Sequence, residues 1–329
     1  MRPYHISNMT IGKGVRYTTA VVLNLIFIIN AAMARDGIEK AKNFFDARKY
    51  SEAKTAFELI LETDSESAEA HYFLGRLYFH NGDYNKAKDY LEKATEIDKA
   101  NIDYHLWLCT IYRDKARTSN FVSALKWAIK WKGELETAFK INPTHLETRK
   151  RLIGYLLNAP GIVGGEMERG KKLAEETIAI DEIQGRLLLA QAYQHMGQVD
   201  SALLEYEKVL ALDPQNSNVH RDQGYMFLYQ KNYLEAESNF RNYIKISPDD
   251  ANAYNSLGDY FLERDMRDQA IGEYQKAIEI DPEFSDSRFK LARAYDKKGM
   301  LEEAFYHYEK WVELTPGSVS YTHLRAHET

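Results

Sequence analysis

The sequence has little cysteine and little proline. Cys109 is the single cysteine among the 329 residues, so no intramolecular disulfide can form and a disulfide-stapled fold is excluded. Proline occurs seven times, whereas tyrosine occurs 23 times and phenylalanine 14 times. Charged residues make up 28% of the chain and hydrophobic residues 44%, as in ordinary soluble, folded proteins. This composition favours helices that pack through aromatic side chains.

Motifs that carry catalysis or bind metals are also missing. The sequence contains no HExxH, CxxC or GxSxG pattern. The segment NGDYNKAKDYLE lacks the alternating oxygen ligands of a calcium loop. The histidines are spread along the chain, as His80, His105, His195, His220 and His307 show. We therefore expect no catalytic residues, no cofactor and no metal site.

An excess of positive charge is absent as well. Lys and Arg number 43 against 49 Asp and Glu, which gives a formal net charge of −6. No basic run or patch with interleaved aromatic residues stands out along the sequence. Nucleic acid is therefore not expected as a partner.

Residues 1–34 are typical of a secretory signal peptide. Lys13 and Arg16 precede an apolar stretch at residues 21–29, and Ala-Met-Ala at residues 32–34 is a suitable cleavage site. The apolar stretch falls short of the roughly 20 residues that span a membrane. We expect export to the periplasm. An uncleaved segment that anchors the chain to the inner membrane is the alternative.

The last residues do not fit the pattern that precedes them. Residues 319–329, VSYTHLRAHET, look like the translation of a transposon-based sequencing adapter. We expect that they are not native and that the gene continues past a point near Ser318. A natural polar tail is the alternative.

An internal repeat of 34 residues dominates the remaining chain. Three kinds of residue recur at this interval: proline, small residues and aromatics. The prolines are Pro214, Pro248, Pro282 and Pro316, and two small series are Ala202, Ala236, Ala270, Ala304 and Ala190, Gly224, Gly258, Ala292. The aromatics are Tyr193, Phe227, Phe261, Tyr295 and Tyr206, Phe240, Tyr274, Tyr308. Within each half-repeat apolar residues follow helical spacing, which predicts amphipathic helices that must stack to bury their faces.

This pattern resembles the tetratricopeptide repeat (TPR), as segments such as AYNSLGDYFLERDMRDQAIGEYQKAIEIDP at Ala253–Pro282 show. The resemblance covers about residues 35–318 and implies an all-α fold, a right-handed superhelical α-solenoid of helix–turn–helix repeats. We place eight repeats, at residues 34–67, 68–101, 102–145, 146–182, 183–216, 217–250, 251–284 and 285–318. Cys109 falls at a small position of the third repeat, where we expect a buried packing thiol.

The third and fourth repeats are longer than the others. The interval is 37 residues from Ala87 to Ala124 and 46 residues from Ala124 to Gly170. We assign about seven of the added residues to the second helix of the third repeat, because a heptad drifts only about 20° around a helix. Trp127 and Trp131 lie on that helix, either as core residues or as a lateral docking surface.

The other added residues enlarge the turn NAPGIVGG at Asn158–Gly165. Pro160 stops the preceding helix, and we expect the next to start near Glu166. A phosphate loop would need a preceding strand and GxxxxGK[ST] spacing, and the turn has neither. We therefore predict a structural or partner-contacting loop.

The resemblance also implies where a partner would bind. In TPR proteins the first helix of each repeat lines a groove through positions 2, 5, 9, 12 and 13, with aromatic and charged side chains that suit an extended peptide or protein segment. A solvated helix face is the alternative for any one residue. Those positions carry Tyr72, Arg76, Phe79, His80, Leu106, Thr110, Arg113, Lys150, Gln191, Gln194, His195, Arg221, Tyr225, Tyr229, Asn255, Asp259, Phe289 and Arg293. The carboxylate clamp of chaperone-binding TPRs is absent, because Gly154 stands where its asparagine would be.

Two functions remain open at the level of the sequence. The first is a non-catalytic scaffold or assembly factor of the cell envelope that binds a protein or peptide in the groove. The second is the TPR arm of a larger, C-terminally truncated enzyme or polysaccharide-export component, which the adapter-like end suggests.

Overall fold

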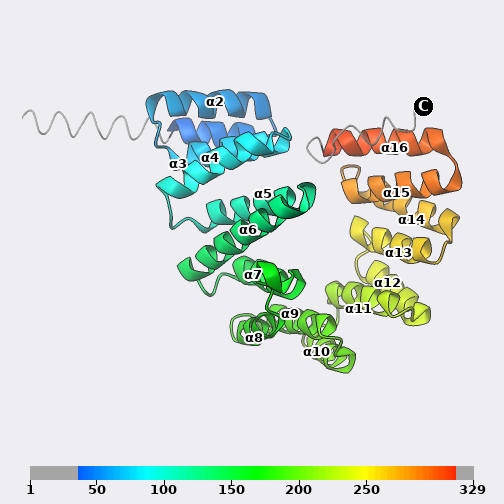
Figure 1. Ribbon diagram of the computed structural model, residues 1–329. Helices are drawn as coiled ribbons and strands as arrows, with labels where there is room; N and C mark the ends of the chain where they lie inside the picture. Colours follow the sequence, from blue (N-terminus) through cyan, green and yellow to red (C-terminus); the bar gives the residue numbers. More distant parts are fainter. Residues whose placement is uncertain (1–35, 316–329) are drawn as a thin grey trace, which may run out of the picture. The chain divides into compact units, whose positions relative to one another are not determined.

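The structure, a computed structural model, describes residues 36–315, and within that range it contains helices and turns without a β-strand (Figure 1). The chain is helical at residues 36–46. The helices that follow are α2 (Tyr50–Thr63), α3 (Ala68–His80), α4 (Tyr84–Ile97), α5 (Ile102–Thr118), α6 (Phe121–Ile141), α7 (Leu146–Asn158), η1 (Gly161–Val163), α8 (Met167–Thr177), α9 (Glu182–His195), α10 (Val199–Leu212), α11 (Ser217–Tyr229), α12 (Tyr233–Ile246), α13 (Ala251–Glu263), α14 (Arg267–Ile280), α15 (Ser285–Lys298) and α16 (Leu301–Leu314). The predicted signal segment and the residues of the adapter-like tail lie outside the described residues. None of the helices between residues 36 and 315 is long and apolar enough to cross a membrane.

The helix boundaries follow from local sequence. Asn101, Asn120 and Asp181 each accept a backbone N–H bond at the start of α5, α6 and α9. Pro214 and Pro282 stand two residues after the last residues of α10 and α14, where proline cannot continue a helix. Capping and proline together divide the chain into short helices joined by tight turns.

Residues 36–77 and 86–99 form one compact unit, unit 1. Its core is aromatic, because the rings of Phe57 and Phe73 stack with centroids 4.9 Å apart and Phe45 meets Phe73 edge-on at 5.2 Å. Leu74 and Leu91 are fully buried beside them. Gly75 lets α3 and α4 approach closely, since a Cβ there would lie 2.6 Å from Leu91 Cγ.

Residues 78–85 and 100–315 form a second compact unit, unit 2. Each helix from α5 to α16 packs against the next along the chain, which gives a stack of helical hairpins (Figure 1). The repeated small residues and aromatics meet inside these hairpins. A Cβ at Gly224 would lie 2.6 Å from Phe240, and one at Gly258 would lie 2.5 Å from Tyr274. The predicted all-α solenoid of stacked hairpins is confirmed.

The long helix of the third repeat is also confirmed, since α6 has 21 residues whereas α10 and α12 have 14 each. Leu135 and Ala138 of α6 are fully buried, and Trp131 packs against the same core, edge-on to Tyr155 at 4.8 Å. Trp127 is half-buried and stacks on Tyr112 at 5.6 Å. Trp131 therefore packs against the core, whereas Trp127 is half-buried at its edge.

The enlarged turn between α7 and α8 is tightly built. Gly164 has a φ of 90°, and a Cβ at Gly165 would lie 1.7 Å from the Ala159 carbonyl oxygen, so both positions need glycine. The Tyr155 hydroxyl lies 2.9 Å from the Ala128 oxygen on α6 and 2.8 Å from the Val163 oxygen in the turn. This hydroxyl ties the turn to α6, and α8 begins at Met167, one residue beyond the expected start.

Candidate functional site

In unit 2 the first helices of successive hairpins, α5, α7, α9, α11, α13 and α15, form one surface, here called the first-helix face. Polar side chains connect neighbouring first helices across it. Gln191 on α9 donates to Asp222 on α11 at 3.3 Å. Asn255 on α13 donates to Asp286 on α15 at 3.1 Å and accepts from Ser287 at 3.0 Å. Hydrogen bonds therefore hold adjacent repeats in register along this face.

The densest group of polar contacts centres on Asp259. Its carboxylate accepts hydrogen bonds from the hydroxyls of Tyr225 and Tyr274, each at 2.8 Å, and from the Lys290 ammonium at 2.8 Å. Lys290 also reaches Asp286 at 2.7 Å. These five residues, here called the Asp259 network, come from α11, α13, α14 and α15. They combine two carboxylates with one ammonium, so the network carries a net negative charge.

Burial sets the protonation of the donors in this network. Burial, reinforced by the Asp259 carboxylate, raises the pKa of Tyr225 and of Tyr274 far above the ordinary 10.0. Burial alone would lower the pKa of Lys290, but the attraction and hydrogen bonds of Asp259 and Asp286 outweigh it, and the pKa rises above 10.5. Both hydroxyls and the ammonium therefore keep their protons at neutral pH and donate to Asp259.

A pocket opens on the first-helix face between α5 and α7. It has a volume of about 440 Å³ and mixes apolar, aromatic and charged side chains, namely Asp103, Leu106, Trp107, Thr110, His145, Glu147 and Arg151. Arg151 is fixed there, because it donates to Glu147 at 2.6 Å and to the Leu106 carbonyl oxygen at 3.0 Å. The pocket therefore offers a positioned guanidinium beside apolar surface.

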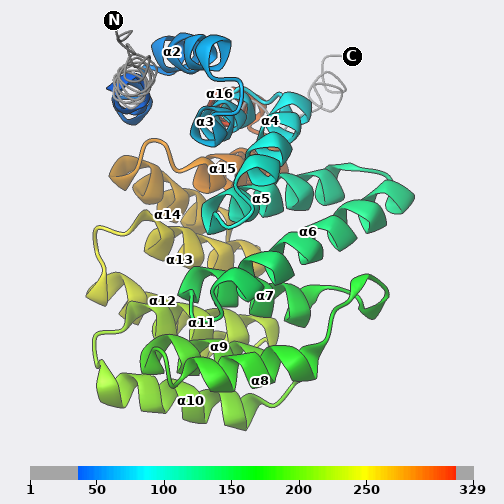
Figure 2. The ribbon, with the colours of Figure 1, turned by 90° about the vertical axis from the view of Figure 1, so that its left-hand side faces the viewer.

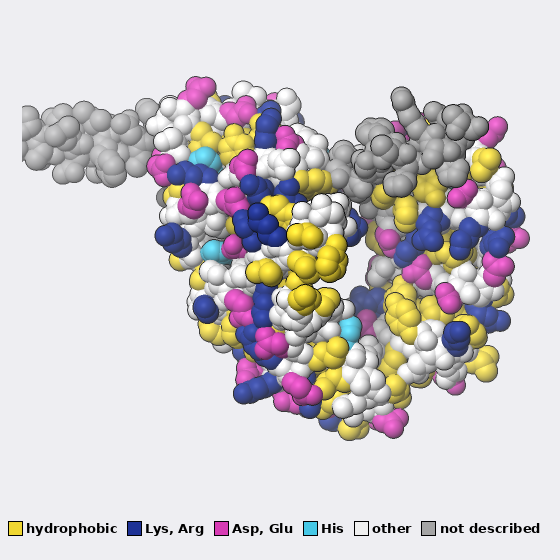
Figure 3. All heavy atoms as spheres, viewed as in Figure 1, with side chains coloured by type: hydrophobic (Ala, Val, Ile, Leu, Met, Phe, Trp, Pro, Cys, Tyr) yellow, Lys and Arg dark blue, Asp and Glu magenta, His cyan; other side chains and the backbone are white. Residues whose placement is uncertain are grey.

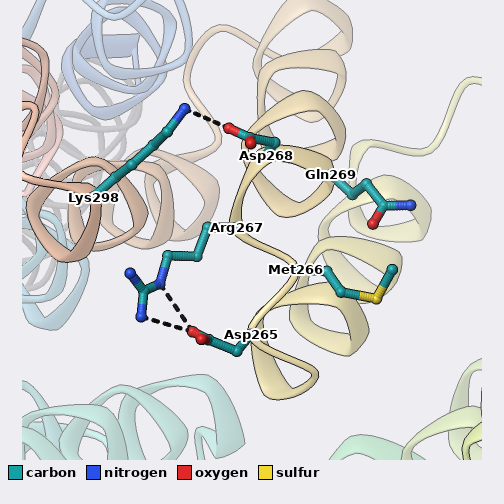
Figure 4. A pocket seen from close by; sticks show the side chains of 6 residues that line it. All are labelled: Asp265, Met266, Arg267, Asp268, Gln269 and Lys298. Carbon is teal, nitrogen blue, oxygen red and sulfur yellow. Dashed lines mark hydrogen bonds and ion pairs between the residues drawn. The ribbon is translucent and has the colours of Figure 1, made fainter.

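A second pocket, of about 380 Å³, lies at the turn between α13 and α14 (Figure 4). Arg267 pairs with Asp265 at 2.9 Å, and Lys298 of α15 reaches across to Asp268. The charges that line this pocket are paired with each other, and Met266 and Gln269 complete the wall. Asp268 and Lys298 are well exposed, so the pocket is a shallow surface feature with no group of reactive residues.

The predicted groove residues differ in exposure. The buried ones are Leu106 and Asn255, at 5% and 1% exposed. The exposed ones are His80, Arg113, Lys150, His195, Tyr229 and Arg293. The half-buried ones are Tyr72, Arg76, Phe79, Thr110, Gln191, Gln194, Arg221, Tyr225, Asp259 and Phe289.

Several of these side chains make contacts within the protein. Phe289 faces the second helix of its own hairpin, with its ring 4.7 Å from Trp311. Gln194 donates to Tyr206 at 3.1 Å, and Arg221 pairs with Asp222 at 2.9 Å. In unit 1 the Arg76 guanidinium lies 4.5 Å from the ring centre of Phe45. Leu106 and Thr110 are the predicted groove residues that the structure brings together in the α5–α7 pocket. Partner binding by the predicted set stays a prediction.

Sequence reasoning missed Lys290, Ser256 and Asp222, which hold the repeats together from a shared position. They are 34 residues apart, at the sixth position of consecutive repeats. That position was not among those implied to line the groove. The recurrence of polar residues there, at the repeat interval, was the signal that could have found them.

Cys109 is buried, as predicted for a packing thiol, and burial raises its pKa far above the ordinary value. The neighbouring His105 contacts Glu134 at 2.6 Å. Between residues 36 and 315 no group of three or more His, Cys, Asp or Glu side chains is placed to hold a metal ion.

Comparison with known proteins agrees with this geometry. Four sequence models, each described as a tetratricopeptide repeat, match residues 44–108, 187–251, 251–284 and 273–306. The chain belongs to the TPR family. Its repeats indicate a scaffold for protein–protein interaction, and TPR proteins are typically non-catalytic.

A solved structure of a TPR protein shares the fold. A tetratricopeptide repeat protein from Parabacteroides merdae is 14% identical, with a TM-score of 0.60 over 83% of this chain and 98% of that one. A thermophilic TPR protein of Thermus thermophilus is 19% identical, with a TM-score of 0.44 over 59% of this chain and 99% of that one. No curated protein sequence matches the chain.

Proposed function

We propose that this TPR protein is a non-catalytic scaffold or assembly factor of the cell envelope that binds an extended protein segment on the first-helix face of unit 2. The α5–α7 pocket carries this proposal, because it unites apolar surface with fixed polar groups on the face that TPR repeats use. Trp107, which is half-buried, supplies apolar contact, and Arg151 supplies a directed donor. A side chain of the partner would occupy the pocket.

The pocket is formed before any ligand arrives, which lowers the entropy cost of binding. Arg151 is held by Glu147 and the Leu106 carbonyl oxygen, so its guanidinium needs no reordering. The partner segment would then continue along α9 and α11, where Gln191 and Arg221 are half-buried. An acidic or hydroxyl side chain suits Arg151, and an apolar one suits the wall beside it.

The binding surface is tested by selection from a random peptide library displayed on phage, followed by calorimetric titration of the enriched peptide. Thr110→Trp should fill the pocket and weaken binding by about tenfold or more, since the lost contact is worth about 1.4 kcal/mol or more. Leu234→Trp on α12, where the side chain is 81% exposed, is the matched control and should bind as the parent does. Equal affinity of both variants would exclude the pocket as the site.

The place in the cell envelope rests on residues 1–34 and has its own test. Mass spectrometry of the protein made in a Gram-negative host should find an N-terminus at Arg35 in the periplasmic fraction. A full-length chain in the membrane fraction would support the anchored alternative. An uncleaved chain in the cytoplasmic fraction would contradict export.

A further inference from the structure

The stretch from the end of α5 to the middle of α6 has an unusual charge for this protein. Residues 115–133 contain Lys115, Arg117, Lys126, Lys130 and Lys132 and no Asp or Glu, although acidic residues outnumber basic ones over the whole chain. Part of this stretch lies on the lengthened helix α6, which is seven residues longer than the 14-residue α10. This local excess of basic residues therefore lies at one end of the α5–α6 hairpin.

Large apolar side chains are exposed at the same end of the hairpin. Phe121 and Val122 at the start of α6 are 74% and 76% exposed, and Ile129 is 58% exposed. Val122 and Ile129 are seven residues apart and share one face of the helix. Ile162 in the α7–α8 turn is 74% exposed. The Tyr155 hydroxyl holds that turn against Ala128 of α6.

These features project on one side of unit 2. In Figure 2 the α5–α6 connection and the α7–α8 turn extend in the same direction, beyond the bodies of their helices. Figure 3 shows hydrophobic side chains gathered over α6 and the turn, with Lys and Arg side chains directly beside them. We call this surface, made of Phe121, Val122, Lys126, Ile129, Lys130 and Ile162, the α6 patch.

The lysines are concentrated around one ring. The ammonium groups of Lys115, Lys126 and Lys130 lie 5.2, 5.6 and 5.6 Å from the ring centre of Trp127. Lys126 and Lys130 are exposed to solvent, whereas Lys132 pairs with Glu166 at 2.8 Å. The α6 patch therefore presents positive charge next to exposed apolar side chains.

We propose that the α6 patch docks on an anionic lipid surface. Apolar side chains beside lysines are the combination that binds at the membrane interface, where the apolar groups enter the head-group region and the lysines stay with the phosphates. The apolar residues lie on a projecting helix end and a turn, so they can enter the head-group region of a membrane without a change in the fold. A surface that receives a partner's anchoring side chain needs a recess, and the recess proposed above for the protein partner lies elsewhere in unit 2, between α5 and α7. The protein partner and the lipid surface therefore occupy different faces.

The test is co-sedimentation of the full chain with vesicles of phosphatidylcholine and phosphatidylglycerol in equal amounts, and with vesicles of phosphatidylcholine alone. The parent should bind the mixed vesicles more tightly, and added salt should weaken that binding. The variant V122S/I129S and the variant K126Q/K130Q should each lose about tenfold or more in vesicle affinity. Circular dichroism should show unchanged helix content, since these side chains are exposed.

Matched controls distinguish binding by this surface from nonspecific adsorption to vesicles. L204S/L234S removes two exposed apolar side chains on α10 and α12, at 51% and 81% exposed, and K245Q/K297Q removes two exposed lysines. Both should bind as the parent does. The apolar stretch at residues 21–29 is common to all variants, so it does not affect the differences between them.

Two outcomes would overturn the proposal. The first is equal binding of the parent to both kinds of vesicle, or parent-like binding by V122S/I129S. The second is vesicle binding that soluble polyglutamate abolishes, combined with full affinity of V122S/I129S for polyglutamate. That result would make the patch a site for an acidic protein segment.

Discussion

At the scale of single residues, glycine positions show how closely the paired helices approach. A Cβ at Gly258 would lie 2.5 Å from the Tyr274 ring, and that ring cannot easily move because its hydroxyl donates to Asp259. We expect Gly258→Ala to lower the free energy of unfolding by about 1–3 kcal/mol, through overpacking. Gly272→Ala on α14, where nothing lies within 4 Å of the new Cβ, should raise it by up to about 1 kcal/mol. Urea unfolding followed by circular dichroism measures both, and a stabilising Gly258→Ala would contradict the close approach.

A single histidine gives the chain one source of pH dependence. His307 on α16 lies flat against the Tyr295 ring at 5.7 Å, and burial together with the charge of Arg288 lowers its pKa below 6.5. The unfolded chain therefore binds a proton more readily than the folded one, so stability should fall as the pH drops through 6.5 and level off below the folded pKa. Urea midpoints at pH 7.5 and 5.5 should differ more for the parent than for His307→Gln. An equal shift in the two proteins would contradict this assignment.

At the scale of elements, the Tyr155 hydroxyl links the α7–α8 turn to α6. Burial raises the pKa of Tyr155 to about 12, so the hydroxyl stays protonated and shares hydrogen bonds with the Ala128 and Val163 carbonyl oxygens. Tyr155→Phe should lower the free energy of unfolding by about 1–2 kcal/mol, because those oxygens lose a buried donor. Tyr229→Phe, whose ring is 84% exposed, should change little. Thermal unfolding compares them, and hydrogen exchange should locate the Tyr155→Phe effect at residues 159–166. Faster exchange elsewhere but not there would argue against the tie.

The helices and their pairing into hairpins are the part of the structure that the sequence predicts. The 34-residue recurrence of proline marks where second helices end, and helical spacing marks which face is buried, so both the hairpins and the longer α6 were predictable. Those signals depend on residues near in sequence. The Asp259 network was not predictable from them, because Tyr225, Asp259 and Lys290 come from three repeats and their contacts depend on how the repeats stack. The basic residues of 115–133 do not form a continuous run in the sequence, because apolar residues separate them, and most of them come together on α6 as one projecting helix.

At the scale of the whole molecule, a repeat protein is stabilised by contacts between neighbours, so each interface contributes separately to cooperativity. In unit 2 the interfaces of α11, α13 and α15 carry charged side chains as well as apolar contacts. The side chain of Asp259 is 20% exposed and accepts three hydrogen bonds, whereas that of Asp268 is 80% exposed and pairs with Lys298. The two carboxylates therefore allow a matched comparison of an interface contact with a surface contact.

Asp259→Asn should lower the free energy of unfolding by about 1–3 kcal/mol, since it removes the charge to which Lys290, Tyr225 and Tyr274 donate. Asp268→Asn should change the free energy of unfolding by no more than about 0.5 kcal/mol, because exposed ion pairs contribute little. Because the lost contacts join α13 to its neighbours, hydrogen exchange in Asp259→Asn should speed up in α15 and α16 while α7 to α9 stay protected. Urea unfolding should then broaden as the hairpins beyond α13 separate from the others. A uniform loss of protection from α5 to α16 would instead mean that unit 2 unfolds as one cooperative body, and that Asp259 stabilises the unit without coupling individual repeats.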